Sequence, residues 1–205
     1  MLHSPLSHTL SLIIITVIVS IAAFNMPALM NRLIFKPTAM RQGQIDRFIT
    51  HGFVHADATH LLFNMITLFF FGSIIESFYR QYFYDLGFVL FYLGGLIFAI
   101  LPSYLKHKNN PYWASLGASG AVSAVLFAYI LFEPWHLIFV FFIPVPAIIF
   151  AFLYVFYSLW AGRRYGDNIN HSAHLWGAAY GVIVTLLIEP RILTHFITKL
   201  LQLPF

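Results

Sequence analysis

The sequence predicts an all-α, polytopic membrane protein with six transmembrane helices. Three observations lead to this fold class: 60% of the 205 residues are hydrophobic, only 9% are charged, and long apolar stretches recur along the chain. Soluble domains carry roughly 25% charged residues, so a chain this poor in charge is adapted to lipid. Because lipid cannot hydrogen-bond an open backbone, such long apolar stretches must be helices.

Six stretches have the length and hydrophobicity of membrane-spanning helices. They cover approximately residues 10–29, 58–78, 82–105, 119–133, 146–160 and 172–188. We interpret the first as a retained span, because it lacks the basic segment and cleavage site of a signal peptide. After Pro190, apolar residues recur at helical spacing with polar residues between them, which predicts an interfacial helix over about 191–203. We expect residues 1–205 to form a single membrane domain.

The fourth stretch is too short to cross a bilayer. The 15 residues from Ser119 to Glu133 rise only about 22 Å, against about 30 Å of hydrocarbon. If the end near Pro134 reaches one surface, the Ser119 end stops inside the membrane. Non-helical backbone at that depth needs protein or a water-filled cavity around it. The sequence therefore predicts a wet cavity with a serine at its rim.

Small residues suggest how a catalytic pair forms. Gly120 belongs to a small-residue stripe in the fourth span, and Gly177 and Gly181 form another in the sixth. Such stripes let transmembrane helices pack backbone against backbone. His174 lies on the same face as these glycines, so packing the two spans together would bring it to Ser119. A serine hydroxyl beside a neutral imidazole is the minimum set for nucleophilic acyl transfer.

Polar residues inside spans are costly and are therefore functional candidates. His60 and Asn64 are four residues apart, so they share one helical face. Together with the Ser119 backbone N–H at a helix N-terminus, their side chains are candidates to stabilise an oxyanion. The acidic residue nearest to His174 in the sequence is Asp167, in the preceding loop. No charged third member is evident, and we expect a Ser–His dyad.

Other features exclude or leave open further classes. The chain has no cysteine, so disulfides, thiolate catalysis and Cys-bound metals are excluded. Basic residues are scattered singly, unlike the basic blocks of nucleic-acid binders. His51, His55 and His60 leave a His-based, metal-dependent membrane protein open, although no His-Glu-x-x-His pattern occurs. Glu76, near the end of the second span, is interpreted as a structural acceptor.

Three segments resemble the signatures of the rhomboid family of intramembrane serine proteases. They are His51–Asn64 (HGFVHADATHLLFN), Gly117–Gly120 (GASG) and Ala173–Gly181 (AHLWGAAYG). Arg47 and Glu76 also stand where many family members carry an arginine and a glutamate. The resemblance extends over approximately residues 10–189 and implies a six-helix, rhomboid-like bundle.

The resemblance also implies an activity: hydrolysis of peptide bonds in or beside the transmembrane helix of a single-span membrane-protein substrate. Ser119 would be the nucleophile and His174 the base, with His60 and Asn64 holding the oxyanion and with no metal, cofactor or nucleic acid. Four glycines would allow close helix packing at the site: Gly117, Gly120, Gly177 and Gly181. Four polar residues would have structural roles: Arg47, His51, His55 and Glu76. The alternative is a catalytically silent relative that binds membrane clients, although such relatives typically lack the serine or the histidine.

Two positions depart from the family pattern. Asp46 stands where several relatives have a tryptophan, which concerns the packing of the first loop. Ser123 stands where some relatives carry a tyrosine that stacks on the catalytic histidine. The His174 ring must therefore be held differently here, and nearby aromatic side chains are candidates.

The family's active site opens away from the cytoplasm, which implies a cytoplasmic N-terminus in a bacterial inner membrane. The basic residues favour the reverse orientation by the positive-inside rule. In the family orientation, the cytoplasmic segments hold three basic residues: Arg80, Arg191 and Lys199. The opposite side holds eight: Arg32, Lys36, Arg41, Arg47, Lys106, Lys108, Arg163 and Arg164. We keep the family orientation as the expectation, because half of the conflicting charges belong to a structured first loop.

Overall fold

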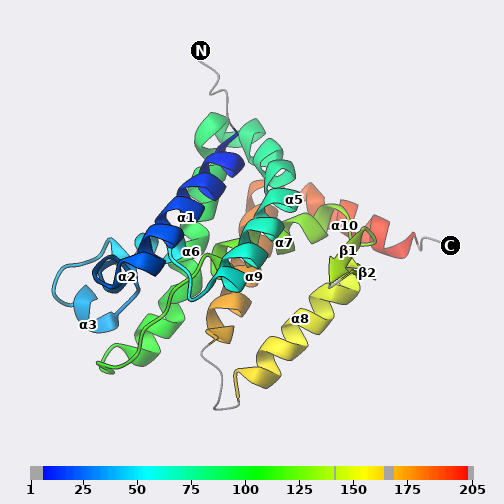
Figure 1. Ribbon diagram of the computed structural model, residues 1–205. Coiled ribbons are helices and arrows are strands. Elements are labelled where there is room, and N and C mark those ends of the chain that lie inside the picture. Colours follow the sequence, from blue (N-terminus) through cyan, green and yellow to red (C-terminus); the bar gives the residue numbers. More distant parts are fainter. Residues whose placement is uncertain (1–6, 141, 164–168, 203–205) are drawn as a thin grey trace.

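A computed structural model describes residues 7–140, 142–163 and 169–202 of the chain (Figure 1). A long helix lies at each of the six stretches predicted from hydrophobicity: α1 (His8–Asn25), α5 (Ala58–Phe83), α6 (Gly87–His107), α7 (Ser119–Phe132), α8 (Ala147–Ala161) and α9 (His171–Ile188). By length and composition, three described stretches are able to cross a membrane: His8–Asn25, Ala58–His107, which contains α5 and α6, and His171–Ile188. The helices α7 and α8 are apolar but shorter, so the count of six spans stays a prediction.

The helix ends differ from the predicted ones in places. The first helix stops at Asn25 and not near residue 29, because Pro27 begins the separate helix α2 (Pro27–Leu33). The helix α5 runs on to Phe83, past the predicted end at 78, and stops where Tyr84 takes a positive φ of 53°. The amphipathic helix α10 (Arg191–Leu201) follows Pro190 as predicted. Residue 203, the expected end of that helix, and Arg164 lie outside the described residues.

The long first loop, between α1 and α5, is folded. It contains α2, α3 (Pro37–Met40), α4 (Arg47–Thr50) and the 3-10 turn η1 (His51–Phe53). The buried Arg47 guanidinium donates to the backbone carbonyls of Asn31 and Ile34, which closes the loop on itself. The Asp46 carboxylate accepts from Arg32 at 2.8 Å on the surface. Asp46, which stands where several relatives have a tryptophan, therefore forms a surface ion pair with Arg32 in this chain.

The all-α expectation needs one correction. Between α7 and α8 the chain forms an antiparallel hairpin, β1 (Leu137–Val140) and β2 (Ile143–Pro146), in which Leu137 lies opposite Pro146. Two prolines in the second strand concealed it in the sequence, because proline cannot donate to a ladder and argues against a strand. A strand at the edge of a two-stranded ribbon can accommodate them.

The helix α7 lies at the centre of the bundle, where α9, α5 and α6 pack around it (Figure 1). Every residue from Gly120 to Leu131 is buried, and the helix is apolar on all sides, as a fully enclosed helix must be. Its N-terminal residue is Ser119. The fold thus places the candidate nucleophile at the end of the most enclosed helix.

Glu76, interpreted from the sequence as a structural acceptor, is buried and accepts from donors on α1 and α5. The Glu76 carboxylate accepts from the backbone N–H groups of His8 and Thr9, from the Thr9 hydroxyl, and from Arg80 one helical turn further along α5. The first N–H groups of a helix lack intrahelical partners and favour a negative charge. Glu76 therefore fastens the start of α1 to α5.

Candidate active site

Ser119 and His174 meet across the contact between α7 and α9. The Ser119 Oγ lies 2.8 Å from the His174 Nε2, within hydrogen-bond distance. When the imidazole is neutral and carries its proton on Nδ1, the serine hydroxyl donates to Nε2. Both residues are half-buried, so neither is sealed from solvent. The pair has the arrangement that nucleophilic acyl transfer requires.

The glycine stripes bring the two helices close enough for this hydrogen bond. A Cβ on Gly177 would lie 2.1 Å from the backbone oxygen of Gly120, and a Cβ on Gly181 would lie 2.1 Å from that of Ala124. Gly120 itself faces Ala99 of α6, where a Cβ would approach to 2.5 Å. The predicted close packing of the fourth and sixth spans is therefore present, and side chains larger than hydrogen at Gly177 and Gly181 would separate the helices.

Gly117, two residues before the serine, is required for two reasons. Its φ is +109°, a region that residues with a Cβ rarely adopt. A Cβ there would also lie 2.6 Å from the Cε1 atom of the His60 ring. The His60 imidazole is therefore packed directly over the loop that leads to Ser119.

Asn64 is buried on the same face of α5, one turn beyond His60. Its side-chain Nδ2 donates to the backbone carbonyl of His60 at 2.8 Å. A primary amide has two donor hydrogens, so this contact fixes the amide while a second donor is left over. The first-turn N–H groups of α7, starting at Ser119, have no intrahelical acceptors. These donors and the His60 ring are the candidate oxyanion ligands.

His51 and His55 position the segment before the nucleophile. The His51 carbonyl accepts from the Gly117 N–H at 2.9 Å, and the His55 Nε2 accepts from the Ala118 N–H at 3.3 Å. The other ring nitrogen of His55 contacts the Ser20 hydroxyl at 2.9 Å, which in turn donates to the Phe53 carbonyl. The sequence marked both histidines as structural, but their direct contact with the nucleophile loop depends on the tertiary fold.

His55 must be neutral to accept from the Ala118 N–H, because an imidazolium has no free acceptor nitrogen. His51 contacts Gly117 through its backbone carbonyl, and its ring donates to the Arg47 carbonyl. Burial lowers the pKa of His51 from 6.5 to about 4. Burial, assisted by the nearby His60 ring, lowers the pKa of His55 to about 3. Both side chains lie in the loop before α5 and are uncharged near neutral pH.

Acidification is therefore expected to destabilise the protein. An unfolded histidine binds a proton near pH 6.5, whereas folded His51 binds one only near pH 4. Stability from this residue is thus complete above pH 6.5 and lost as the pH falls toward 4, by roughly 2 kcal/mol at pH 5. Thermal unfolding in detergent between pH 7.5 and pH 5 measures the loss. His51→Gln should give a shallower pH dependence, and an unchanged slope would contradict this assignment.

Two residues near the site were not identified from the sequence. The Asn170 side chain caps α9: its Oδ1 accepts from the Ala173 N–H and the Ser103 hydroxyl, and its Nδ2 donates to the Ser115 hydroxyl. Asparagine before an apolar helix is a capping signal that was available. The second residue is Tyr154 of α8, whose ring stacks on His174. Asp167, the acidic residue considered as a partner of His174, lies outside the described residues.

No group of three or more His, Cys, Asp or Glu side chains within residues 7–140, 142–163 and 169–202 is arranged to hold a metal ion. The His51 ring contacts the Arg47 carbonyl, whereas the two ring nitrogens of His55 contact Ser20 and the Ala118 N–H. The His-based metal site considered from the sequence therefore has no assembled ligand set in the described part of the chain.

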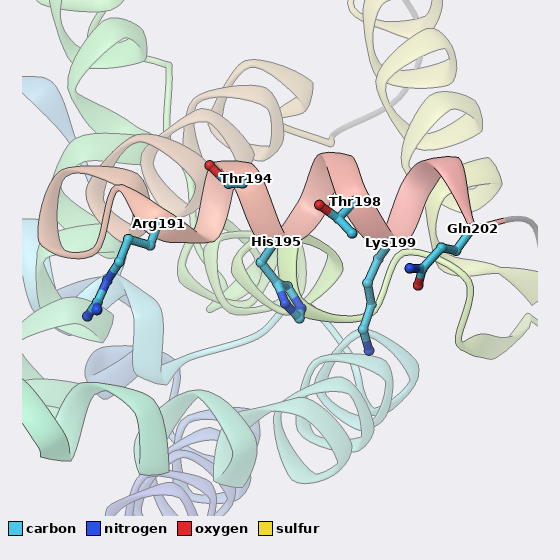
Figure 2. A pocket seen from close by; sticks show the side chains of 6 residues that line it. All are labelled: Arg191, Thr194, His195, Thr198, Lys199 and Gln202. Carbon is cyan, nitrogen blue, oxygen red and sulfur yellow. The ribbon is translucent and has the colours of Figure 1, made fainter.

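An open pocket lies along α10 (Figure 2). The helix α10 contacts the Phe132 end of α7, away from Ser119. It is lined by Arg191, Thr194, His195, Thr198, Lys199 and Gln202. The three basic side chains have acceptors: Arg191 pairs with Glu189, His195 donates to the Phe132 carbonyl, and Lys199 pairs with Glu133. The His195 and Lys199 contacts fasten α10 to the C-terminal end of α7, so the pocket borders a structural contact.

The apolar helices and the buried polar site define a polytopic helical membrane protein. The profile of the Rhomboid domain matches residues 42–191. The chain belongs to the rhomboid family.

Similar curated proteins carry the same family name. RHOMBOID-like protein 12, mitochondrial, of Arabidopsis thaliana is 32% identical over 173 residues, which cover 78% of this chain and 51% of that protein. Rhomboid-related protein 1 of Caenorhabditis elegans is 26% identical over 167 residues, covering 78% and 45%. Rhomboid protease GlpG of Haemophilus influenzae is 28% identical over 146 residues, covering 70% and 69%. This chain spans about half the length of the first two proteins.

Proposed function

We propose that this protein is an intramembrane serine endopeptidase that cleaves single-span membrane proteins with a Ser119–His174 dyad. The hydrogen bond of 2.8 Å between Ser119 Oγ and His174 Nε2, at the half-buried start of α7, carries the proposal. Membership of the rhomboid family and the similarity to a relative named a protease support it. Neither a metal nor a cofactor is needed for the reaction.

The reaction follows from the geometry of the pair. His174 Nε2 removes the Ser119 proton as Oγ attacks the carbonyl carbon of the scissile peptide, which forms a tetrahedral oxyanion. The imidazolium returns that proton to the leaving nitrogen, the C–N bond breaks, and an acyl-serine remains. Water, deprotonated by His174, then attacks the acyl carbon, and the proton returns to Ser119 as the second product leaves.

The oxyanion would be held by donors that are already oriented. His60 is packed against Gly117, and the Asn64 amide is fixed by the His60 carbonyl. The Ser119 N–H adds a backbone donor at the positive end of α7. Each such donor contributes typically about 2.7–4 kcal/mol to the transition state in serine proteases.

The substrate class and the location extend the proposal. The short helix α7 would place Ser119 below the membrane surface, so a transmembrane segment that unwinds there would present its backbone to the pair. We assign the protein to a bacterial inner membrane, with the site opening on the extracytoplasmic side. The mitochondrial Arabidopsis relative shows that the family is not confined to bacteria, so the assignment is tested separately, by labelling introduced cysteines from each side of sealed vesicles.

A serine-directed probe tests the function. Purified protein in detergent is incubated with a fluorescent fluorophosphonate, whose phosphorus accepts Ser119 Oγ while fluoride leaves. Wild type is expected to be labelled, with and without a metal chelator, whereas Ser119→Ala and His174→Ala are expected to remain unlabelled. Unfolded wild type provides the background.

Three results would overturn the proposal. Equal labelling of Ser119→Ala would mean that another nucleophile reacts. Absence of labelling in folded wild type would instead favour the non-catalytic client-binding alternative. Loss of labelling with chelator would point to the metal-dependent alternative.

A further inference from the structure

We propose that Tyr154 of α8 is a positioning residue, which holds the His174 imidazole in place relative to Ser119. The inference rests on the proposed function, because it assigns a third helix a part in the same reaction. Tyr154 acts through His174 and does not itself touch the reacting atoms.

The helix α8 presents a face of small residues with the Tyr154 ring directed inward between them. Its buried residues are all small: Ala147, Ala151, Ser158 and Ala161. Tyr154 lies on the same helical face, three residues after Ala151 and four before Ser158. Larger side chains, such as Phe152 and Phe156, are exposed on the outer side. The small neighbours allow α8 to approach α9 while the Tyr154 ring fills the space beside His174.

The Tyr154 ring lies along the face of the base. Its centroid is 5.9 Å from that of the His174 imidazole, with an angle of 26° between the planes. Phe127 of α7 and Phe150 of α8 contact the Tyr154 ring in turn, at 5.5 Å and 5.7 Å between centroids. A stacked ring that is itself confined limits rotation of the imidazole, which keeps Nε2 directed at Ser119.

The Tyr154 hydroxyl connects the ring to the helix of the nucleophile. It lies 2.5 Å from the Ser123 Oγ, and the Ser123 hydroxyl donates to the Ser119 carbonyl at 2.7 Å. A serine hydroxyl has a single proton, so Tyr154 is the donor and Ser123 the acceptor in the first bond. Tyr154 thus stacks on the base and is tied through Ser123 to the backbone of the nucleophile.

Position 123 explains why the ring comes from α8. A larger side chain at this position, one turn after Ser119 on α7, would occupy the space that the Tyr154 hydroxyl reaches. Here the small Ser123 is buried and leaves that space to Tyr154. The histidine support depends in this chain on the docking of α8 against α7 and α9.

The test compares the inactivation rate constant (kinact) and the half-saturation constant (KI) of the fluorophosphonate. Tyr154→Met fills most of the volume of the ring but removes its plane. We expect kinact to fall about 10- to 100-fold with KI within about twofold of wild type, because a misplaced base slows the chemical step and not probe binding. The matched control, Phe156→Met, changes an aromatic ring that is 70% exposed on the same helix, and it should leave both constants unchanged.

A second set of variants removes the hydroxyl link and keeps an aromatic ring at position 154. Tyr154→Phe removes the bond to Ser123 alone, whereas Ser123→Ala removes that bond and the bond to the Ser119 carbonyl. Tyr154→Phe should lower kinact about threefold, and adding it to Ser123→Ala should lower kinact no further, because the shared hydrogen bond is already absent. Wild-type kinact in folded Tyr154→Met, additive losses in the double variant, or equal losses in Phe156→Met would each overturn the inference. If Tyr154→Met does not fold, Tyr154→Phe and Ser123→Ala still test the inference. Wild type that fails to react refutes the proposed function instead, before any Tyr154 variant is compared.

Discussion

Ser119→Ala is expected to lower the turnover of a single-span substrate at least about a thousandfold, and adding His174→Ala to it should lower turnover little further. The nucleophile and its base act as a unit, so the loss of either one removes the covalent route, and the two losses do not multiply. Cleavage of a single-span reporter protein in proteoliposomes, followed on gels, measures both single variants and the double variant.

The matched control for this comparison of single and double variants is Ser77→Ala. Ser77 is an exposed residue of α5 whose hydroxyl donates to the Ser73 carbonyl within the same helix. It should retain wild-type turnover. Multiplicative losses in the double variant would show that Ser119 and His174 contribute independently, and residual turnover above a tenth in Ser119→Ala would remove Ser119 as the nucleophile.

Gly117→Ala is expected to fold but to lose turnover by about 100-fold or more. The added methyl meets the His60 ring at 2.6 Å, and the backbone is already at φ +109°. Backbone strain of this kind lowers the stability of the fold by about 1–3 kcal/mol. Displacement of the preorganised oxyanion donor His60 lowers the rate by a factor of about 10²–10³. Turnover of the same reporter, together with the melting temperature in detergent, separates the catalytic loss from the loss in stability.

Gly43→Ala provides the comparison. Gly43 also has a positive φ, +87°, but no atom lies within 4 Å of the position of its added methyl. The two variants share the backbone strain, and only Gly117→Ala disturbs His60. Equal losses of turnover in both variants would mean that strain alone is responsible and that the contact between Gly117 and His60 has no catalytic consequence.

The positions of the long helices could be predicted from hydrophobicity, because an apolar stretch in lipid has few conformations available. Their ends were less certain. Residues 26–30 (MPALM) continue the apolar stretch of α1, so only the proline at position 27 marked the break. The hairpin over residues 137–146 was missed because its two prolines argue against a strand in any local reading.

The candidate site divides in the same way. Ser119, His174 and the glycines between their helices could be recognised, since polar and small residues inside apolar spans are rare and costly. The contacts of His51 and His55 with the Gly117–Ala118 backbone, and that of Tyr154 with His174, join residues that are 20 to 66 positions apart. Periodicity within one helix carries no information about such contacts.

The sequence by itself determined that this protein is helical and membrane-embedded, that it has a serine at the start of a short fourth helix, and that a histidine shares a face with two glycines. Composition and local spacing decide these features, because they depend on the free energy of each segment in lipid. Only the tertiary structure decided that α7 and α9 approach until Ser119 Oγ lies 2.8 Å from His174 Nε2. It also decided that the histidine is supported from α8, because packing among three helices sets which side chains share a space.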